Sequence, residues 1–144
     1  MAAVRLTLSH ALKIIEVSFE KARALGLKPL SVAVLDAGGN LVAFQRQDGA
    51  SIKRFEIARG KAAGALALGV SSRAVATIAS ERPSFVASIG AILPDGVIPA
   101  AGGVLIAGDD GLLIGAAGAT GDTSDNDEAC VLEGIKAAGL SVFS

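Results

Sequence analysis

The chain has 144 residues, of which 51% are hydrophobic and 19% are charged, and its formal net charge is −1. This length predicts one domain covering residues 1–144, and the composition is typical of a folded globular protein. No apolar run approaches the roughly 20 residues that span a bilayer, so we expect no membrane contact. The N-terminus shows no long apolar region and no clear small-residue cleavage site, so we expect no signal peptide. A single cysteine excludes an intrachain disulfide and is typical of a reducing compartment, so we expect a cytoplasmic protein.

The charges are unevenly distributed along the chain. Residues 1–94 carry 12 basic and 6 acidic residues, whereas residues 95–144 carry one basic and eight acidic residues. Such halves attract each other within one subunit or between subunits; the alternative is two solvated faces of opposite charge. No basic stripe with interleaved aromatic residues is present, which argues against nucleic-acid binding. One histidine and one cysteine cannot form a zinc site in one subunit, so we expect no metal centre.

Hydrophobic periodicity and turn residues predict four helices and four strands in the order α-β-β-α-α-β-β-α. The expected ranges are a helix over 8–25, strands over 30–35 and 41–44, a helix over 51–69, a short helix over 72–80, strands over 104–106 and 112–116, and a helix over 124–138. Both strand pairs are joined by short turns and should form antiparallel hairpins, which makes the fold class α+β. Residues 83–93 show only a weak pattern.

Cap residues mark several of the helix ends. Thr7 or Ser9 can cap the first helix, because a short hydroxyl side chain accepts from the free N–H groups of a helix start. Ser51 starts the second helical pattern, and Gly69 lies near its end. These residues fix the expected ends of the two longest helices in the first half of the chain.

The segment 99–130 gathers glycines and carboxylates. Half of the 18 glycines of the chain lie within 90–121, and a glycine-rich loop that leads into a helix is often an anion site. The acidic residues here would repel a phosphate, whereas they suit the free N–H groups of a helix start. An acidic helix cap, with approximate capping-box spacing from Ser124, is therefore favoured for most of them. Asp127 and Glu128 are the candidates for proton transfer.

Five further residues are candidates for ligand binding. Arg46 is the best-placed cation to hold a carboxylate, with Asp48 beside it, and the alternative is a surface pair between the two. Lys61 lies in mid-helix among alanines, and we expect it to be at least partly buried against an acid from its own or a neighbouring subunit. Gly102 and Gly103 either line a pocket with exposed N–H groups or only mark a bulge or a crowded turn.

His10 and Cys130 are the candidate axial ligands for a haem iron. Each residue is more often structural than a ligand. They matter because tyrosine is absent and the one methionine is Met1, so no other conventional axial ligand exists in the chain.

Four motifs in combination resemble the GlcG/HbpS-like family, often described as haem-degrading, which includes the C-terminal domain of PduO-type proteins. The motifs are SVAVLDAGGNLVAFQRQDGA (31–50), ARGKAAGA (58–65), RPSFVASI with LPDGVIPAAGGVLI (82–106) and GAAGATGDTSDNDEAC (115–130). The resemblance covers nearly the whole chain. It implies an antiparallel sheet of about five strands layered with helices, assembly into homo-oligomers, and a ligand cleft near the glycine-rich segment and the 46–48 turn. It also makes haem the candidate cofactor, since some members bind it.

These observations favour a cytoplasmic homo-oligomer, a dimer or a higher even assembly, that binds a small organic ligand, with haem as the candidate. An alternative is an enzyme that acts on a small carboxylate metabolite of an aromatic or glycolate catabolic pathway. In that enzyme Arg46 would orient the carboxylate, and Asp127 or Glu128 would transfer a proton. A second alternative is a structural or sensory partner protein.

Overall fold

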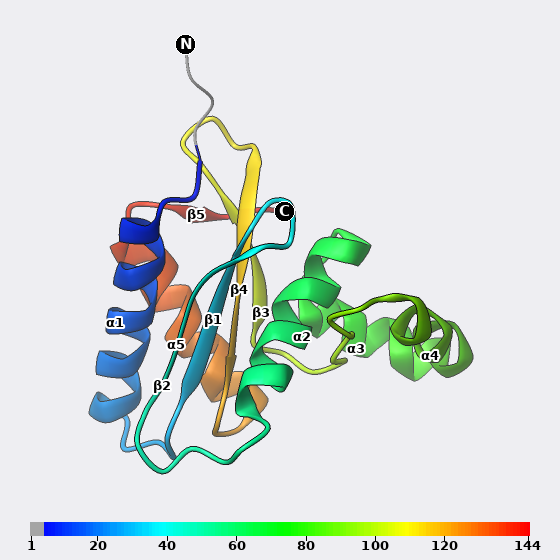
Figure 1. Ribbon diagram of the computed structural model, residues 1–144, viewed down its shortest axis with the longest axis horizontal. Coiled ribbons are helices and arrows are strands. Elements are labelled where there is room, and N and C mark those ends of the chain that lie inside the picture. The colour runs from blue at the N-terminus through cyan, green and yellow to red at the C-terminus, as the bar shows by residue number, and fades with distance from the viewer. Residues whose placement is uncertain (1–4) are drawn as a thin grey trace.

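The computed structural model describes residues 5–144, which form five helices and one five-stranded antiparallel sheet. The strand order is β2-β1-β4-β3-β5. Helices α1 and α5 cover one face of the sheet, and α2 covers the other face, with α3 and α4 projecting beyond it (Figure 1). The α+β class predicted from the sequence is confirmed. The elements are α1 (Leu8–Ala24), β1 (Ser31–Asp36), β2 (Leu41–Arg46), α2 (Arg54–Leu68), α3 (Ser72–Glu81), α4 (Pro83–Ile92), β3 (Gly103–Ala107), β4 (Leu113–Thr120), α5 (Ser124–Ala137) and β5 (Ser141–Val142).

Threonine side chains cap the two helices that lie together on one face of the sheet. Thr7 Oγ1 accepts a hydrogen bond from the N–H of His10, and His10 Nδ1 accepts one from the N–H of Thr7. This reciprocal pair satisfies two N–H groups at the start of α1 and selects Thr7 over Ser9 as its cap. Helix α5 is capped by Thr123, so the approximate capping box expected from Ser124 is wrong by one residue, because Ser124 already lies in the helix.

The two central strands are covered on both faces. In β1, Val32 and Val34 pack with α1 and α5, whereas Leu35 packs against α2. Strand β4 consists largely of glycine and alanine, and a side chain at Gly118 would collide with the carbonyl group of Ala58 in α2. These small residues let the helix backbone lie directly on the sheet, which is how α2 brings its polar residues close to β4.

Helix α2 begins at Arg54, three residues after the expected start at Ser51. Residues 51–53 form a turn, and Lys53, at the cap position, makes no capping hydrogen bond with its side chain. The helix ends as expected at Gly69, which adopts the left-handed conformation with φ of 72°.

Helix α4 and strand β5 are two elements that the sequence pattern did not predict. Helix α4 starts with Pro83 in its first turn and has small or apolar residues on nearly every side, so it shows no amphipathic stripe. Strand β5 is only two residues long and pairs Val142 with Ile106 of β3. Strand β4 continues to Thr120, four residues past its expected end, because glycine and alanine hide the alternation of a strand.

Within residues 5–144, no single helix is long and apolar enough to cross a membrane. Helices α2 and α3 reach that length and composition only as a pair, and the chain bends by 75° between them.

Candidate functional site

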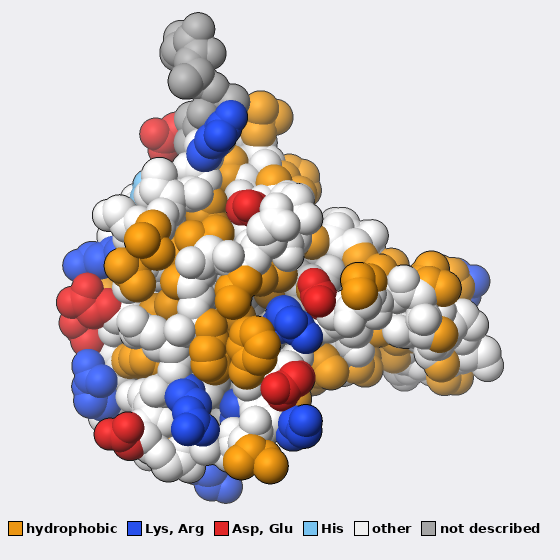
Figure 2. Space-filling model, in the orientation of Figure 1, with side chains coloured by type: hydrophobic (Ala, Val, Ile, Leu, Met, Phe, Trp, Pro, Cys, Tyr) orange, Lys and Arg blue, Asp and Glu red, His pale blue; other side chains and the backbone are white. Residues whose placement is uncertain are grey.

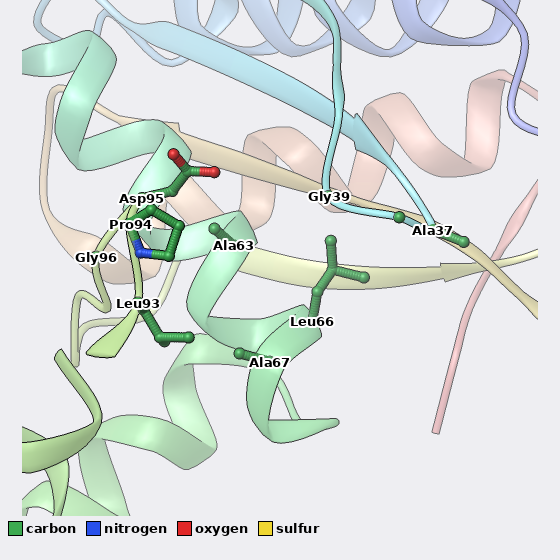
Figure 3. Close-up of a pocket in the computed structure, with 10 residues that line it drawn as sticks. Ala37, Gly39, Ala63, Leu66, Ala67, Leu93, Pro94, Asp95 and Gly96 are labelled. Carbon is green, nitrogen blue, oxygen red and sulfur yellow. The ribbon is translucent and has the colours of Figure 1, made fainter. Parts of the chain in front are cut away.

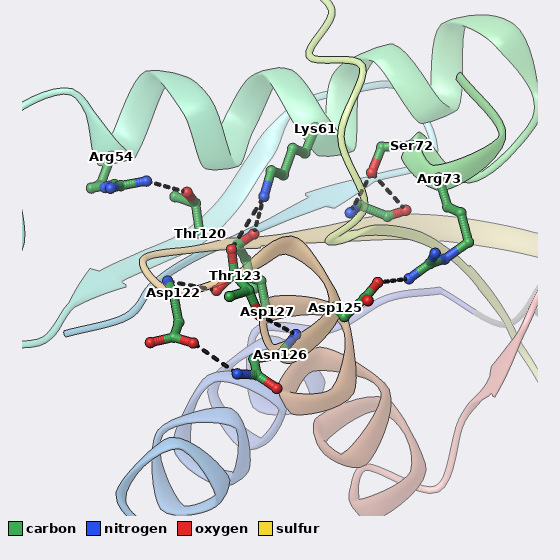
Figure 4. A network of polar contacts seen from close by, with 12 residues as sticks. Arg54, Lys61, Ser72, Arg73, Thr120, Asp122, Thr123, Asp125, Asn126 and Asp127 are labelled. Carbon is green, nitrogen blue, oxygen red and sulfur yellow. Dashed lines mark hydrogen bonds and ion pairs between the residues drawn. The ribbon is translucent and has the colours of Figure 1, made fainter. Parts of the chain in front are cut away.

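A buried ion pair joins the middle of α2 to the first turn of α5 (Figure 4). Lys61 Nζ lies 3.4 Å from Asp127 Oδ2 and donates a hydrogen bond of 2.9 Å to the carbonyl oxygen of Ala119 in β4. Only 3% of the Lys61 side chain and 2% of the Asp127 side chain are exposed. The expectation that Lys61 is buried against an acid is confirmed, and the acid belongs to the same chain.

Burial dominates the proton equilibria of this pair. The loss of hydration lowers the pKa of Lys61 and raises the pKa of Asp127, because it penalises the charged form of each group. Their mutual attraction and hydrogen bond oppose both shifts. Asp127 Oδ1 also accepts a hydrogen bond of 2.9 Å from the N–H of Asp122. Both carboxylate oxygens are thus engaged inside the fold, and the pair connects α2 to α5 with almost no exposure to solvent.

Gly102 and Gly103 lie against this pair, at positions where no larger residue fits. A side chain at Gly102, whose φ is 128°, would collide with the carbonyl oxygen of Ala119 and with the Lys61 side chain. A side chain at Gly103 would collide with the backbone of Lys61, and the N–H of Gly103 donates a hydrogen bond of 2.7 Å to Ser72 Oγ. Of the two interpretations that the sequence left open, close packing therefore explains both glycines, and the N–H of Gly103 is already used.

Asp122 holds the acidic segment ahead of α5 in place by side-chain hydrogen bonds. Asp122 Oδ1 accepts a hydrogen bond from the N–H of Lys28, and Oδ2 accepts one of 2.8 Å from Asn126 Nδ2. Hydrogen bonds from Asn126 and from the backbone N–H groups of Thr123 and Lys28 lower the pKa of Asp122 to about 2. The residue that caps α5 is Thr123, whose Oγ1 accepts from the N–H of Asn126, and Asp122 instead bonds to Lys28 and to the Asn126 side chain. These contacts therefore do not confirm an acidic cap.

A second charged cluster lies at the surface between α3 and α5 (Figure 4). Arg73 Nε and Nη2 each lie 3.1 Å from an oxygen of Glu128, and Nη2 also contacts Asp125. The hydrogen bonds to Glu128 and then to Asp125 raise the pKa of Arg73. Glu128 is 19% exposed, whereas Asp125 is 80% exposed. Sequence reasoning missed Arg73, because no local pattern relates it to acids 52 and 55 positions further along the chain.

Arg46 and Asp48 do not join either cluster. Both residues are exposed at the end of β2, and they form no ion pair with each other among residues 5–144. The basic residue that reaches the sheet from this side is instead Arg54, whose Nη1 donates a hydrogen bond of 2.8 Å to Thr120 Oγ1 (Figure 4). No local sequence pattern predicts this contact, because the two residues lie 66 positions apart.

The two candidate haem ligands both have structural roles in this fold. Cys130 is completely buried in α5, and burial raises the pKa of its thiol to about 11. His10 is partly buried, and its Nδ1 accepts the capping hydrogen bond from Thr7. Nδ1 therefore carries a lone pair rather than a proton in the capped helix, and the proton of the neutral ring lies on Nε2.

A surface hollow of about 550 Å³ lies beside the Arg73 cluster. It is bounded by α3, by residues 99–101 ahead of β3 and by the start of α5, so it lies beside the glycine-rich segment. The ligand cleft that the resemblance implies there stays a prediction. The 46–48 turn does not line it. A smaller hollow of about 290 Å³ lies between α2, the β1–β2 turn and residues 93–96 (Figure 3). Within residues 5–144, no three His, Cys, Asp or Glu side chains are placed to hold a metal ion.

Comparison with known proteins relates the chain to a protein family and to several solved structures. The model of the family described as "Haem degrading protein HbpS-like" matches residues 6–136. A crystal structure of a PduOC–haem complex is similar to the chain, with 23% identity, a TM-score of 0.85, and coverage of 98% of this chain and 100% of that one. A crystal structure of HbpS is also similar, with 27% identity, a TM-score of 0.79, and coverage of 94% of this chain and 92% of that one.

A third similar structure is Klebsiella pneumoniae protein ORFY, with 22% identity, a TM-score of 0.84, and coverage of 96% of this chain and 94% of that one. No curated protein matches the sequence. The likeness to the solved structures extends over the sheet and its covering helices, as the high coverage of both chains requires.

Proposed function

The chain belongs to the HbpS-like family, and from this membership we propose that it binds a small organic ligand through a carboxylate group, with haem as the candidate. Two findings support haem: the family description names haem, and a structural relative is a complex with haem. The observation that carries the proposed site is the hollow of about 550 Å³ with the Arg73 guanidinium at its edge. This volume lies within the range of ordinary small-molecule sites.

Arg73 is suited to exchange one of its two carboxylate partners for a ligand. Asp125 is largely exposed, and an exposed ion pair contributes little because water screens it. Glu128 is better covered and holds Nε and one side of Nη2. A ligand carboxylate that displaces Asp125 would find an oriented guanidinium, which binds two oxygens at once. Each haem has two propionate carboxylates, so haem and a small carboxylate metabolite share this chemistry.

Iron ligation does not fit the same hollow. None of the residues that line it is a histidine, cysteine, methionine or tyrosine. Cys130 is buried elsewhere with a raised thiol pKa, and His10 would have to lose its capping hydrogen bond or move its proton from Nε2 before either nitrogen could bind a metal. The proposal therefore contains no iron–protein bond, and haem would be held by its carboxylates and its apolar ring.

Protoporphyrin IX, which has the same propionates and ring as haem but no iron, tests this proposal. The chain has no tryptophan or tyrosine, so binding is followed through the Soret absorption of the porphyrins. We expect haemin and protoporphyrin IX to bind with dissociation constants within about threefold of each other. Arg73→Gln should weaken both roughly fivefold, a modest factor because the site is half exposed. Asp125→Asn should tighten both, because it removes the competing carboxylate. Arg23→Gln, an exposed arginine on α1 at the other face of the sheet, is the matched control.

Three outcomes would contradict the proposal. If neither porphyrin binds, haem is excluded as a ligand. If both bind but Arg73→Gln behaves like Arg23→Gln, the ligand does not use this hollow. If only haemin binds, and His10→Ala or Cys130→Ala abolishes its Soret shift, iron ligation holds the ligand instead.

We also propose that the protein is a cytoplasmic homo-oligomer, as expected from the sequence. The catalytic alternative receives less support, because Asp127 is sealed in its pair with Lys61 and Glu128 is bonded to Arg73. No proton transfer is therefore part of the proposed function.

A further inference from the structure

Helix α4 is apolar but mostly uncovered. It has no charged residue along its ten positions, yet Val86 is its only buried residue. Phe85 is 36% exposed and Ile92 is 75% exposed. Helices α3 and α4 form an arm that projects from the sheet, and in Figure 1 helix α4 lies at its far end. Figure 2 shows hydrophobic side chains spread over this arm. An apolar helix with this much exposed surface is typical of an interaction site.

The arm has both a ridge and a groove. Phe85, Ile89 and Ile92 are spaced four and three residues apart, so they form one stripe along α4. Beside the helix is a hollow of about 320 Å³ whose lining has no charged or hydrogen-bonding side chain. It is lined by Ala79, Pro83, Val86, Ala87, Gly90, Val97 and Pro99. One copy of the arm therefore carries both halves of a contact. It has a ridge of large side chains, and it has a groove lined mostly by small residues that can accept such a ridge.

Charge at the two ends of α4 favours a second copy as the occupant. Arg82 precedes α4, where a cation opposes the positive end of the helix dipole, and it forms no ion pair among residues 5–144. Its guanidinium lies 4.1 Å from the centre of the Phe85 ring. The other end of the helix has free carbonyl groups, which form the negative end of the helix dipole. Asp95, three residues further on, is already paired with Arg59 at 3.7 Å and so is not counted as a partner of Arg82. A helix of ten residues is about 15 Å long, so an antiparallel copy places each Arg82 beside the negative end of its partner.

We propose that α4 is the contact helix of a two-fold dimer of this chain, in which the Phe85–Ile89–Ile92 ridge of each copy packs against the arm of the other. The contact is isologous, because one surface supplies both halves of it. This inference rests on the self-association proposed above and specifies its surface. Higher even assemblies would contain this dimer as a unit.

Matched isoleucine substitutions test the contact. Ile92→Glu places a charge on the ridge, and Ile52→Glu makes the same change at an isoleucine that is 86% exposed in the turn ahead of α2. Light scattering during size exclusion at about 10 μM should give a dimer, or an even multiple, for the wild type and for Ile52→Glu. Ile92→Glu should dissociate by at least one two-fold step, with a dissociation constant raised at least about 30-fold. Unchanged circular dichroism would show that both variants are folded.

A disulfide probe tests the two-fold geometry. Ser88 is exposed near the middle of α4, and the native cysteine is buried, so Ser88→Cys provides the one accessible thiol. Oxidation should cross-link Ser88→Cys into covalent dimers much faster than Ser51→Cys, which lies ahead of α2. A wild type of monomer mass at about 100 μM would overturn self-association as a whole, and binding of that monomer to lipid vesicles would identify α4 as a membrane-surface helix instead. An oligomer that persists equally in Ile92→Glu and Ile52→Glu would overturn only the role of α4.

Discussion

Replacing Lys61 with methionine tests the buried pair most directly. Methionine has a similar length and no charge, so Lys61→Met leaves Asp127 without its cationic partner in a nearly closed site. Breaking a buried pair by removing one partner costs about 3–5 kcal/mol. For a domain of this size, that loss corresponds to a melting temperature lowered by roughly 10 °C. Asp127 keeps its hydrogen bond from the N–H of Asp122, which places the expected loss toward the lower end of the range.

The assay is urea unfolding followed by circular dichroism, with Lys53→Met as the matched control. Lys53 is exposed at the start of α2 and makes no capping hydrogen bond, so its replacement should change the free energy of unfolding by less than about 0.5 kcal/mol. The double variant Lys61→Met/Asp127→Asn should be more stable than Lys61→Met alone, because no lone charge then remains buried.

The pH dependence of Lys61→Met supplies a second readout. Burial already raises the pKa of Asp127 in the wild type, and loss of the lysine removes the attraction that opposes this shift. An acid whose pKa is raised in the folded state stabilises the fold at low pH, and this contribution is lost as the pH rises through the folded pKa. The stability gap between wild type and Lys61→Met should therefore narrow as the pH falls from 7 toward 5. A Lys61→Met protein that unfolds like Lys53→Met at every pH would refute the reasoning.

Three further predictions concern the glycine loop, Asp122 and the cysteine. Gly102→Ala should destabilise the fold by at least about 2 kcal/mol in urea unfolding, because of its positive φ and the collision with Ala119. Gly139→Ala, at a positive φ with open space around it, should cost clearly less, and equal losses would contradict the packing argument. The depressed pKa of Asp122 stabilises the fold above the usual carboxyl pKa, so the stability gap between wild type and Asp122→Asn should close as the pH falls from about 5 to 2. A constant gap would count against a stabilising role for the hydrogen bonds of Asp122. Cys130 should react with a thiol reagent at pH 8 only as fast as the domain unfolds, and rapid labelling of the native protein would show that it is accessible.

Local patterns in the sequence predicted the elements whose signals are local. The stripe of α1, the hairpin turns and Gly69 each lie within a few residues of the element that they define, and each was placed within about three residues. Helix α4 was missed because its apolar residues are not confined to one side, and the short β5 has no period of its own.

The candidate site was only partly predictable for the same reason. The burial of Lys61 could be inferred from its alanine neighbours, but its pairing with Asp127 spans 66 positions and depends on the place of α2 over the sheet. Arg73 was missed because α3 meets α5 only through tertiary packing. Arg46, the candidate to hold a ligand carboxylate, lies exposed at the end of β2 and outside both charged clusters, so its ligand role stays a prediction.

Strand β4 lies between β1 and β3, and helices cover both of its faces. Most side chains of β4 are a hydrogen atom or a methyl group, so the backbone of α2 lies almost directly on the peptide groups of β4. A change of side-chain rotamer therefore cannot open a path for water to these peptide groups. The amide hydrogens of β4 should therefore exchange with deuterium only when the whole domain opens. The slowest amides of β4 would then measure global stability, whereas amides in the projecting arm would report motions of much lower free energy.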